Sequence, residues 1–184
     1  MVTKLKDAKG RAFAVIPAAQ LDQALVLARK VLKTADITPK ACAVLATNNA
    51  QVPEGSTYAA GASLSASDKT VTTVTVFAVK DVASMASQMS ASKKAVSQCS
   101  VVTISIAGKK VTSRIVPVDV STSGDVSLGA LTTETSAAGA KATTLSVSGI
   151  KGNLAATAVK TGTAVSSSAS AELVKLVNSI LANG

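Results

Sequence analysis

From Ser100 to Lys160 the sequence is a nearly unbroken series of β-strand patterns separated by short turn signals. Val, Ile, Leu and Thr dominate the segments that we predict as strands: residues 101–106, 111–120, 126–135, 143–147 and 154–160. The turns between them contain Gly108-Lys109 and Ser123-Gly124-Asp125. Connections this short join antiparallel neighbours only, so this half of the chain predicts an antiparallel sheet.

Helices and one more hairpin are predicted outside this run. Apolar residues at helical spacing predict helices over 17–33 and 81–99, while alternation predicts strands over 58–64 and 71–79. A turn-rich loop is expected over 48–55, and a serine cluster precedes a last helix built on Leu173, Leu176, Val177, Ile180 and Leu181. The fold class is therefore α+β, with an antiparallel sheet of about six to eight strands packed by helices. The order is helix, hairpin, helix, strand run and C-terminal helix.

The length and the charge indicate one domain with a basic surface. We predict that residues 1–16 form a basic N-terminal arm and residues 17–184 a single α+β sensor-like domain. The formal net charge is +9, but the lysines are scattered and no aromatic residues are interleaved with them. This pattern argues against a nucleic-acid partner. A solvated basic surface is the simpler interpretation, and a dedicated anion-binding face is the alternative.

Cys42 and Cys99 are the two cysteines of the chain. Cys99 ends the predicted helix 81–99 on its apolar side, where it can reach the segment that carries Cys42. We predict one disulfide between them, because the Ser/Thr/Ala-rich, lysine-dominated composition suggests an exported protein. Buried free thiols are the alternative that the sequence leaves open.

The composition excludes several kinds of catalytic site. The chain has no histidine, which excludes Ser-His-Asp and Cys-His arrangements, and its two cysteines lack the spacing of a zinc site. We therefore expect no enzyme activity, no metal and no cofactor. Asp119, Asp125 and Glu134 are the carboxylates that a hydrolase would need, but we interpret them as solvated turn and strand residues.

Three short segments resemble the family of the extracellular sensor domain of the mycobacterial receptor kinase PknH, which includes actinobacterial secreted proteins and lipoproteins. They are Pro39-Lys40-Ala41-Cys42, Val96-Ser97-Gln98-Cys99-Ser100 and Gly152-Asn153-Leu154. The resemblance covers residue 17 to the end of the chain. It implies an α+β domain with a cleft between the sheet and the helices that binds an extracellular ligand. The second disulfide and the tryptophan that many members carry are absent here.

We therefore expect a non-catalytic, exported ligand-binding or sensor-type domain at the cell envelope. Tyr58, Met85 and Met89 are the candidate ligand contacts, since Tyr58 follows a loop near a strand edge and the methionines suit a pliable groove. The expected partner is an anionic or amphipathic envelope component, bound by a monomer that a leader or anchor before Met1 would tether. A structural or adhesion protein that uses its basic face or a strand edge is the alternative. A carboxylate-dependent hydrolase is the weaker one.

Overall fold

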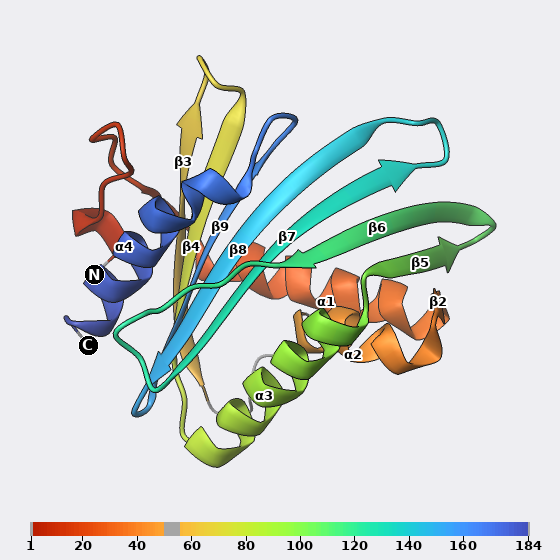
Figure 1. The fold of residues 1–184 in the computed structure, drawn as a ribbon. Helices are drawn as coiled ribbons and strands as arrows, with labels where there is room; N and C mark the ends of the chain where they lie inside the picture. The colour runs from red at the N-terminus through yellow and green to blue at the C-terminus, as the bar shows by residue number, and fades with distance from the viewer. Residues whose placement is uncertain (1, 50–55, 184) are drawn as a thin grey trace.

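The computed structural model describes residues 2–49 and 56–183, and these residues build one antiparallel sheet (Figure 1). Its strands are β1 (Ala14–Ile16), β2 (Asp36–Thr38), β3 (Thr57–Ser65), β4 (Thr70–Ala78), β5 (Val101–Ile106), β6 (Lys109–Pro117), β7 (Val126–Ser136), β8 (Lys141–Lys151) and β9 (Leu154–Gly162). Their order in space is β1-β3-β4-β9-β8-β7-β6-β5-β2. The α+β class and the antiparallel sheet are confirmed. The described residues form nine strands because β1 and β2, of three residues each, pair onto the two edges.

The α-helices of the described residues are α1 (Ala18–Thr34), α2 (Ala43–Asn49), α3 (Val82–Gln98) and α4 (Ser170–Leu181). Short 3-10 turns cover Val2–Lys4, Lys40–Cys42 and Ser167–Ala169. Asp81 caps α3 as its position suggests, because its carboxylate accepts a hydrogen bond from the backbone N–H of Ser84 at 2.9 Å. Residues 50–55 of the loop predicted over 48–55 lie outside the described residues. None of the described helices combines the length and hydropathy that crossing a membrane requires.

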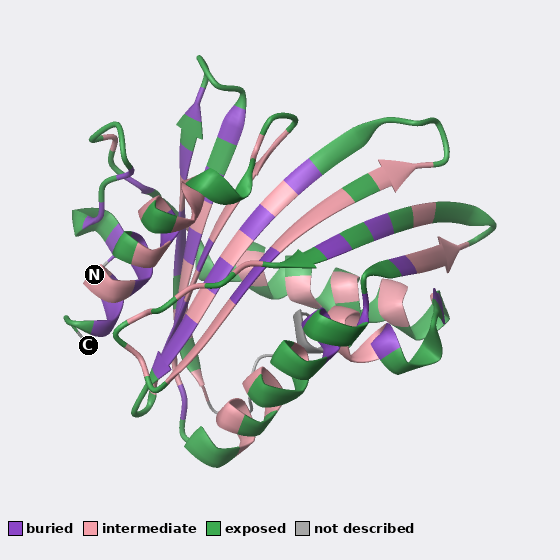
Figure 2. Cartoon of the chain, in the orientation of Figure 1, coloured by how far each residue is buried: buried purple, intermediate pink, exposed green. Residues whose placement is uncertain are grey.

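Alternation along the strands produces two cores, one on each face of the sheet. On one face, α4 packs on β8 and β9 and covers a core that includes Val74, Leu145, Val147, Leu173 and Ile180. On the other face, α2 and α3 cover a smaller core built around Ile37, Ala95, Val96, Val102 and Ile115. Figure 2 shows buried and half-buried positions alternating along β8, as expected for a strand with one more deeply covered face.

The N-terminal residues pack onto the same face as α4. Val2, Leu5 and Phe13 belong to the α4 core, and each is at most 9% exposed. Gly61 on β3 makes this approach possible, since a Cβ there would lie 2.4 Å from Cγ1 of Val2. The boundary at residue 16 stays a prediction, but the residues before it contribute directly to the core of the described structure.

Candidate functional site

The disulfide predicted between Cys42 and Cys99 is confirmed. The two sulfur atoms are 2.04 Å apart, and both residues are buried in the α3 core. The bond joins the turn before α2 to the residue that follows α3. It therefore fastens two helical segments over one end of the sheet, and its role in the α3 core is structural.

Tyr58 lies on the α3 side of the sheet, near the start of α1. Its ring is half-buried, with its centroid 6.1 Å from that of Phe77 on the neighbouring strand. Its hydroxyl donates a hydrogen bond to the carboxylate of Asp22 on α1. Tyr58 thus connects β3 to α1 through its hydroxyl, while its ring lies beside Phe77 of β4.

Hydroxyl groups line the sheet between the places where α1 and α3 contact it. α1 packs on β3, and α3 packs on β6 and β7. The intervening strands present half-buried hydroxyl side chains to this side: Thr73, Thr75, Thr144, Ser146, Ser148, Thr157 and Thr161. Several pair with each other across strands, with oxygen–oxygen distances of 2.9 Å for Ser148 and Thr157 and 3.1 Å for Thr144 and Thr161. The two hydroxyls of each pair hydrogen-bond to each other, so these side chains primarily stabilise the sheet.

The two methionines lie on a different element from Tyr58. Met85 and Met89 are half-buried on α3, whose sheet contacts are with β6 and β7. Tyr58 contacts β4 and α1 instead. The contacts of Tyr58 with Phe77 and Asp22 do not involve either methionine, so the role of the three residues as ligand contacts stays a prediction.

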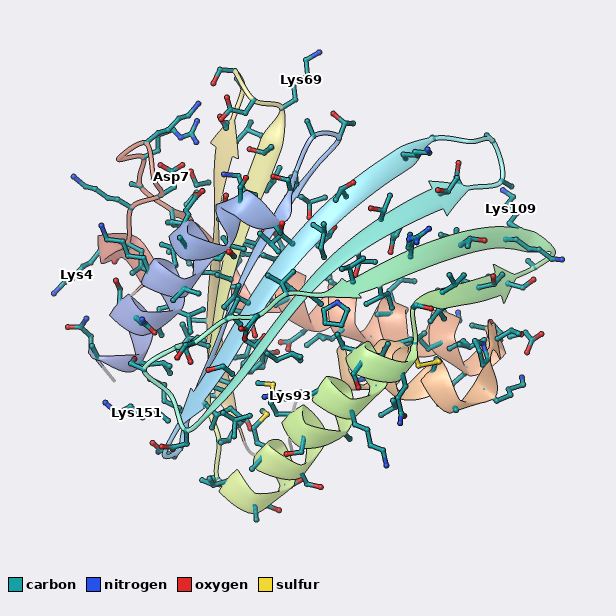
Figure 3. All side chains as sticks on the ribbon, viewed as in Figure 1. Lys4, Asp7, Lys69, Lys93, Lys109 and Lys151 are labelled. Carbon is teal, nitrogen blue, oxygen red and sulfur yellow. A yellow bond between two sulfur atoms is a disulfide. The ribbon has the colours of Figure 1, made fainter. Side chains whose placement is uncertain are left out.

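A groove of about 850 Å³ lies between the N-terminal residues and α4, and we call it the arm–α4 groove. Its lining residues are Lys4, Leu5, Lys6, Asp7, Ala8, Glu172, Lys175, Leu176, Ser179 and Asn183. Figure 3 shows the side chain of Lys4 extending from the arm beside α4. The leucines Leu5 and Leu176 belong to the core beneath, so the groove combines apolar walls with charged rims.

The arm–α4 groove carries a net positive charge. The carboxylate of Asp7 is paired with Arg11 at 2.7 Å, and the carboxylate of Glu172 is paired with Lys160 at 2.7 Å. Lys4, Lys6 and Lys175 are exposed, and none of them has an acidic partner among the ion pairs of the described residues. Both acids are thus neutralised by cations of their own. Among the residues that the structure describes, no acid therefore compensates the positive charge of these three lysines.

The charge of Asp7 is held in place by its neighbours. Burial raises the pKa of this carboxyl, but hydrogen bonds from the Ser63 hydroxyl, from Arg11 and from the backbone N–H of Lys9 outweigh burial and lower it to about 2. An acid with so low a pKa stays ionised and cannot donate a proton near neutral pH. The groove therefore contains no general acid at Asp7.

A second, shallower groove of about 670 Å³ lies on the opposite flank of α4. Asp119, Val174 and Asn178 are among its lining residues, and Lys175, Ser179 and Asn183 border both grooves. The side chain of Asn178 accepts a hydrogen bond from the backbone N–H of Ser123 at 2.7 Å. This second groove therefore follows the line where α4 meets the β6–β7 connection.

The carboxylates considered for hydrolysis lie apart from the arm–α4 groove. Asp119 borders the second groove, Asp125 accepts a hydrogen bond from the backbone N–H of Gly152 at 3.2 Å, and Glu134 is exposed on β7. The described residues also contain no group of three His, Cys, Asp or Glu side chains that could hold a metal ion. The arm–α4 groove could not be predicted from the sequence, because no local pattern indicates that Lys4 and Lys6 line the same groove as Lys175.

Comparison with known proteins finds a solved structure of similar fold. A scan against protein-family models finds no match, and a search of curated proteins finds none either. Among solved structures, the extracellular domain of PknH from Mycobacterium tuberculosis matches with a TM-score of 0.55 and 15% sequence identity. The match covers 79% of this chain and 77% of that chain. At this identity the likeness shows a shared fold, so the chain has the fold of that extracellular domain.

Proposed function

We propose that this protein is a non-catalytic, exported domain that binds an anionic amphipathic ligand in the arm–α4 groove. The observation that carries the proposal is the groove itself, where three lysines that form no ion pair with an acid of the described residues surround a leucine-lined wall. Apolar walls with a few polar groups at the rim are typical of small-molecule sites. A chain with an anionic head would place its head among the lysines and its tail along Leu5 and Leu176.

An exported location and a sensor-type role are part of the same proposal. The fold is that of an extracellular domain, and a buried disulfide suits an oxidising compartment. A domain of this kind would act at the cell envelope, with the groove exposed to envelope components. Hydrolysis is not proposed, because each acid in the groove is bound to its own cation.

Calorimetric titration with dodecyl phosphate below its micellar concentration tests the proposal. We expect the protein to bind this probe and to melt at a higher temperature in its presence, because ligands that bind the native state stabilise it. Dodecyl maltoside supplies the same tail with a neutral head, and inorganic phosphate supplies the head alone. Both should bind at least tenfold more weakly than dodecyl phosphate, because each offers only half of the groove's contacts.

A matched pair of variants assigns the binding to the groove. The variant Lys4→Gln/Lys6→Gln/Lys175→Gln should bind dodecyl phosphate roughly tenfold more weakly, since exposed ion pairs contribute up to about 1 kcal/mol each. The control variant Lys30→Gln/Lys93→Gln/Lys94→Gln removes the same charge from exposed positions of α1 and α3. Equal weakening in both variants, or equal affinity for the neutral probe, would contradict the proposal.

A further inference from the structure

We propose that the uncovered outer face of strands β5 to β8 binds an acidic polysaccharide. We call this surface the outer threonine face. It consists of Val101, Thr103, Lys110, Thr112, Arg114, Val116, Thr133, Thr135 and Lys141. It is separate from the arm–α4 groove, and the inference does not rest on the proposed function.

The outer threonine face exists because α4 covers only part of one side of the sheet. α4 packs on β8 and β9, and the same side continues past it over β7, β6 and β5. On β6 the side chains of Ser113 and Ile115 point to the α3 core and are buried, while Arg114 and Val116 point the other way and are exposed. The side of β5 to β7 that α4 does not cover is therefore available to a partner.

The strand register arranges this face in rows. One row runs across four strands through Thr103, Thr112, Thr135 and Lys141. The next row runs through Val101, Arg114 and Thr133 and ends at the buried Thr143, which borders the face. The hydroxyl oxygens of Thr103 and Thr112 are 3.5 Å apart, and those of Thr133 and Thr143 are also 3.5 Å apart. Threonine hydroxyls therefore form adjacent rows that can donate to and accept from the hydroxyl groups of a sugar.

Three cations lie at separate positions around these hydroxyls. Lys110 and Arg114 lie four residues apart on β6, which corresponds to about 13 Å along a strand. Lys141 lies two strands from Thr112, or about 10 Å across the sheet. A ligand would therefore meet three separate positive charges, in contrast to one concentrated site. An extended polymer with repeated acidic groups fits this spacing.

No acid of the described residues compensates the positive charge of the outer threonine face. Strands β5 to β8 contain one acidic residue, Glu134. Its side chain points to the opposite side of the sheet, since Glu134 is in register with Ser113, which faces the α3 core. None of Lys110, Arg114 and Lys141 has a partner among the ion pairs of the described residues. Charge complementarity therefore favours a polyanion on this surface.

The chemistry of the face favours a sugar polymer over nucleic acid. Single-stranded nucleic acid is bound through aromatic side chains on which the bases stack, and this face contains none. Threonine hydroxyls instead match the many hydroxyl groups of a polysaccharide, while the cations match its carboxylates. Val101 and Val116, 47% and 46% exposed, supply apolar contacts for the sugar rings at one border of the face.

Affinity measurements with polygalacturonate test this inference. We expect the protein to bind this polymer at low salt, and we expect the variant Lys110→Gln/Arg114→Gln/Lys141→Gln to bind about tenfold more weakly, as three exposed ion pairs would give. Its affinity should also depend less steeply on salt, because fewer counterions are exchanged. The variant Lys30→Gln/Lys93→Gln/Lys94→Gln removes the same charge elsewhere and should keep most of the affinity.

Lysine footprinting of the unmodified protein supplies a readout that needs no variant. Bound polygalacturonate should protect Lys110 and Lys141 from acetylation and leave Lys93 and Lys94 reactive. Equal loss of affinity in the two triple variants would overturn the inference, since it would indicate net charge alone. Tighter binding to single-stranded DNA of equal charge concentration, or protection confined to Lys4, Lys6 and Lys175, would overturn it as well. Binding of dodecyl phosphate should be unchanged in the face variant.

Discussion

At the level of single residues, Asp7 shows how a buried charge attaches the N-terminal residues to the sheet. Its side chain is 1% exposed and accepts hydrogen bonds from the Ser63 hydroxyl at 2.7 Å and from the backbone N–H groups of Lys9 and Arg11 at 2.9 and 3.0 Å. The guanidinium of Arg11 completes the shell. A buried carboxylate with this many donors stabilises the fold in its ionised form.

Replacing Asp7 should lower stability in a pH-dependent manner. Because its pKa is about 2 in the folded protein and about 4 when unfolded, ionised Asp7 contributes roughly 2 kcal/mol above pH 4. This contribution disappears as the pH falls from about 4 towards 2. Urea denaturation of Asp7→Asn should therefore show a loss of about 2 kcal/mol at pH 7 and a smaller loss near pH 2. Asp36→Asn, at an exposed ion pair with Lys40, should cost much less. Equal losses at both pH values would contradict this assignment.

At the level of elements, the N-terminal residues behave as part of the α4 layer. Phe13 is 3% exposed in the α4 core, whereas Phe77 is half-buried on the other side of the sheet. We expect Phe13→Ala to reduce the free energy of unfolding by about 3–5 kcal/mol and Phe77→Ala to reduce it less, because the cost follows the buried volume removed. Chemical denaturation of the two variants measures the difference. A smaller loss for Phe13→Ala than for Phe77→Ala would show that the arm is not packed as described.

The long elements could be predicted from the sequence, whereas the pairing of the short strands could not. The helices α1 and α3 and the strands β3 to β9 carry enough apolar periodicity to be recognised within a few residues of their ends. β1 and β2 have three residues each, which is too few for an alternating pattern, and their pairing with β3 and β5 is a long-range choice. The predicted number of strands, about six to eight, was therefore lower than the nine strands of the described residues.

At the level of the whole molecule, one sheet separates two cores, and the disulfide belongs to the smaller one. Cys42 and Cys99 are 57 residues apart in sequence, and in the chain-entropy treatment such a loop corresponds to about 4 kcal/mol. We expect Cys42→Ser/Cys99→Ser to lose about this much stability in urea, and reduction of the unaltered protein to give a similar loss. A loss below about 1 kcal/mol would contradict this expectation.

Hydrogen exchange of the reduced protein should show which layer depends on the bond. The amides of α3 and β5 should exchange faster than before relative to those of α4 and β8, because the disulfide fastens only the α2–α3 layer. The oxidised protein is the reference. A uniform acceleration over both layers would indicate that the two cores open as one unit.

The amino-acid sequence is enough to predict the α+β class, the positions of the long elements and the pairing of the two cysteines, and it excludes histidine chemistry. Local periodicity and composition carry that information, since both are properties of neighbouring residues. The tertiary structure alone brings Lys4 and Lys6 into one groove with Lys175, joins the Tyr58 hydroxyl to Asp22 of α1, and leaves the outer threonine face uncovered. These features depend on which strands pair and on how far α4 reaches across the sheet, and contacts between residues far apart in the chain decide both.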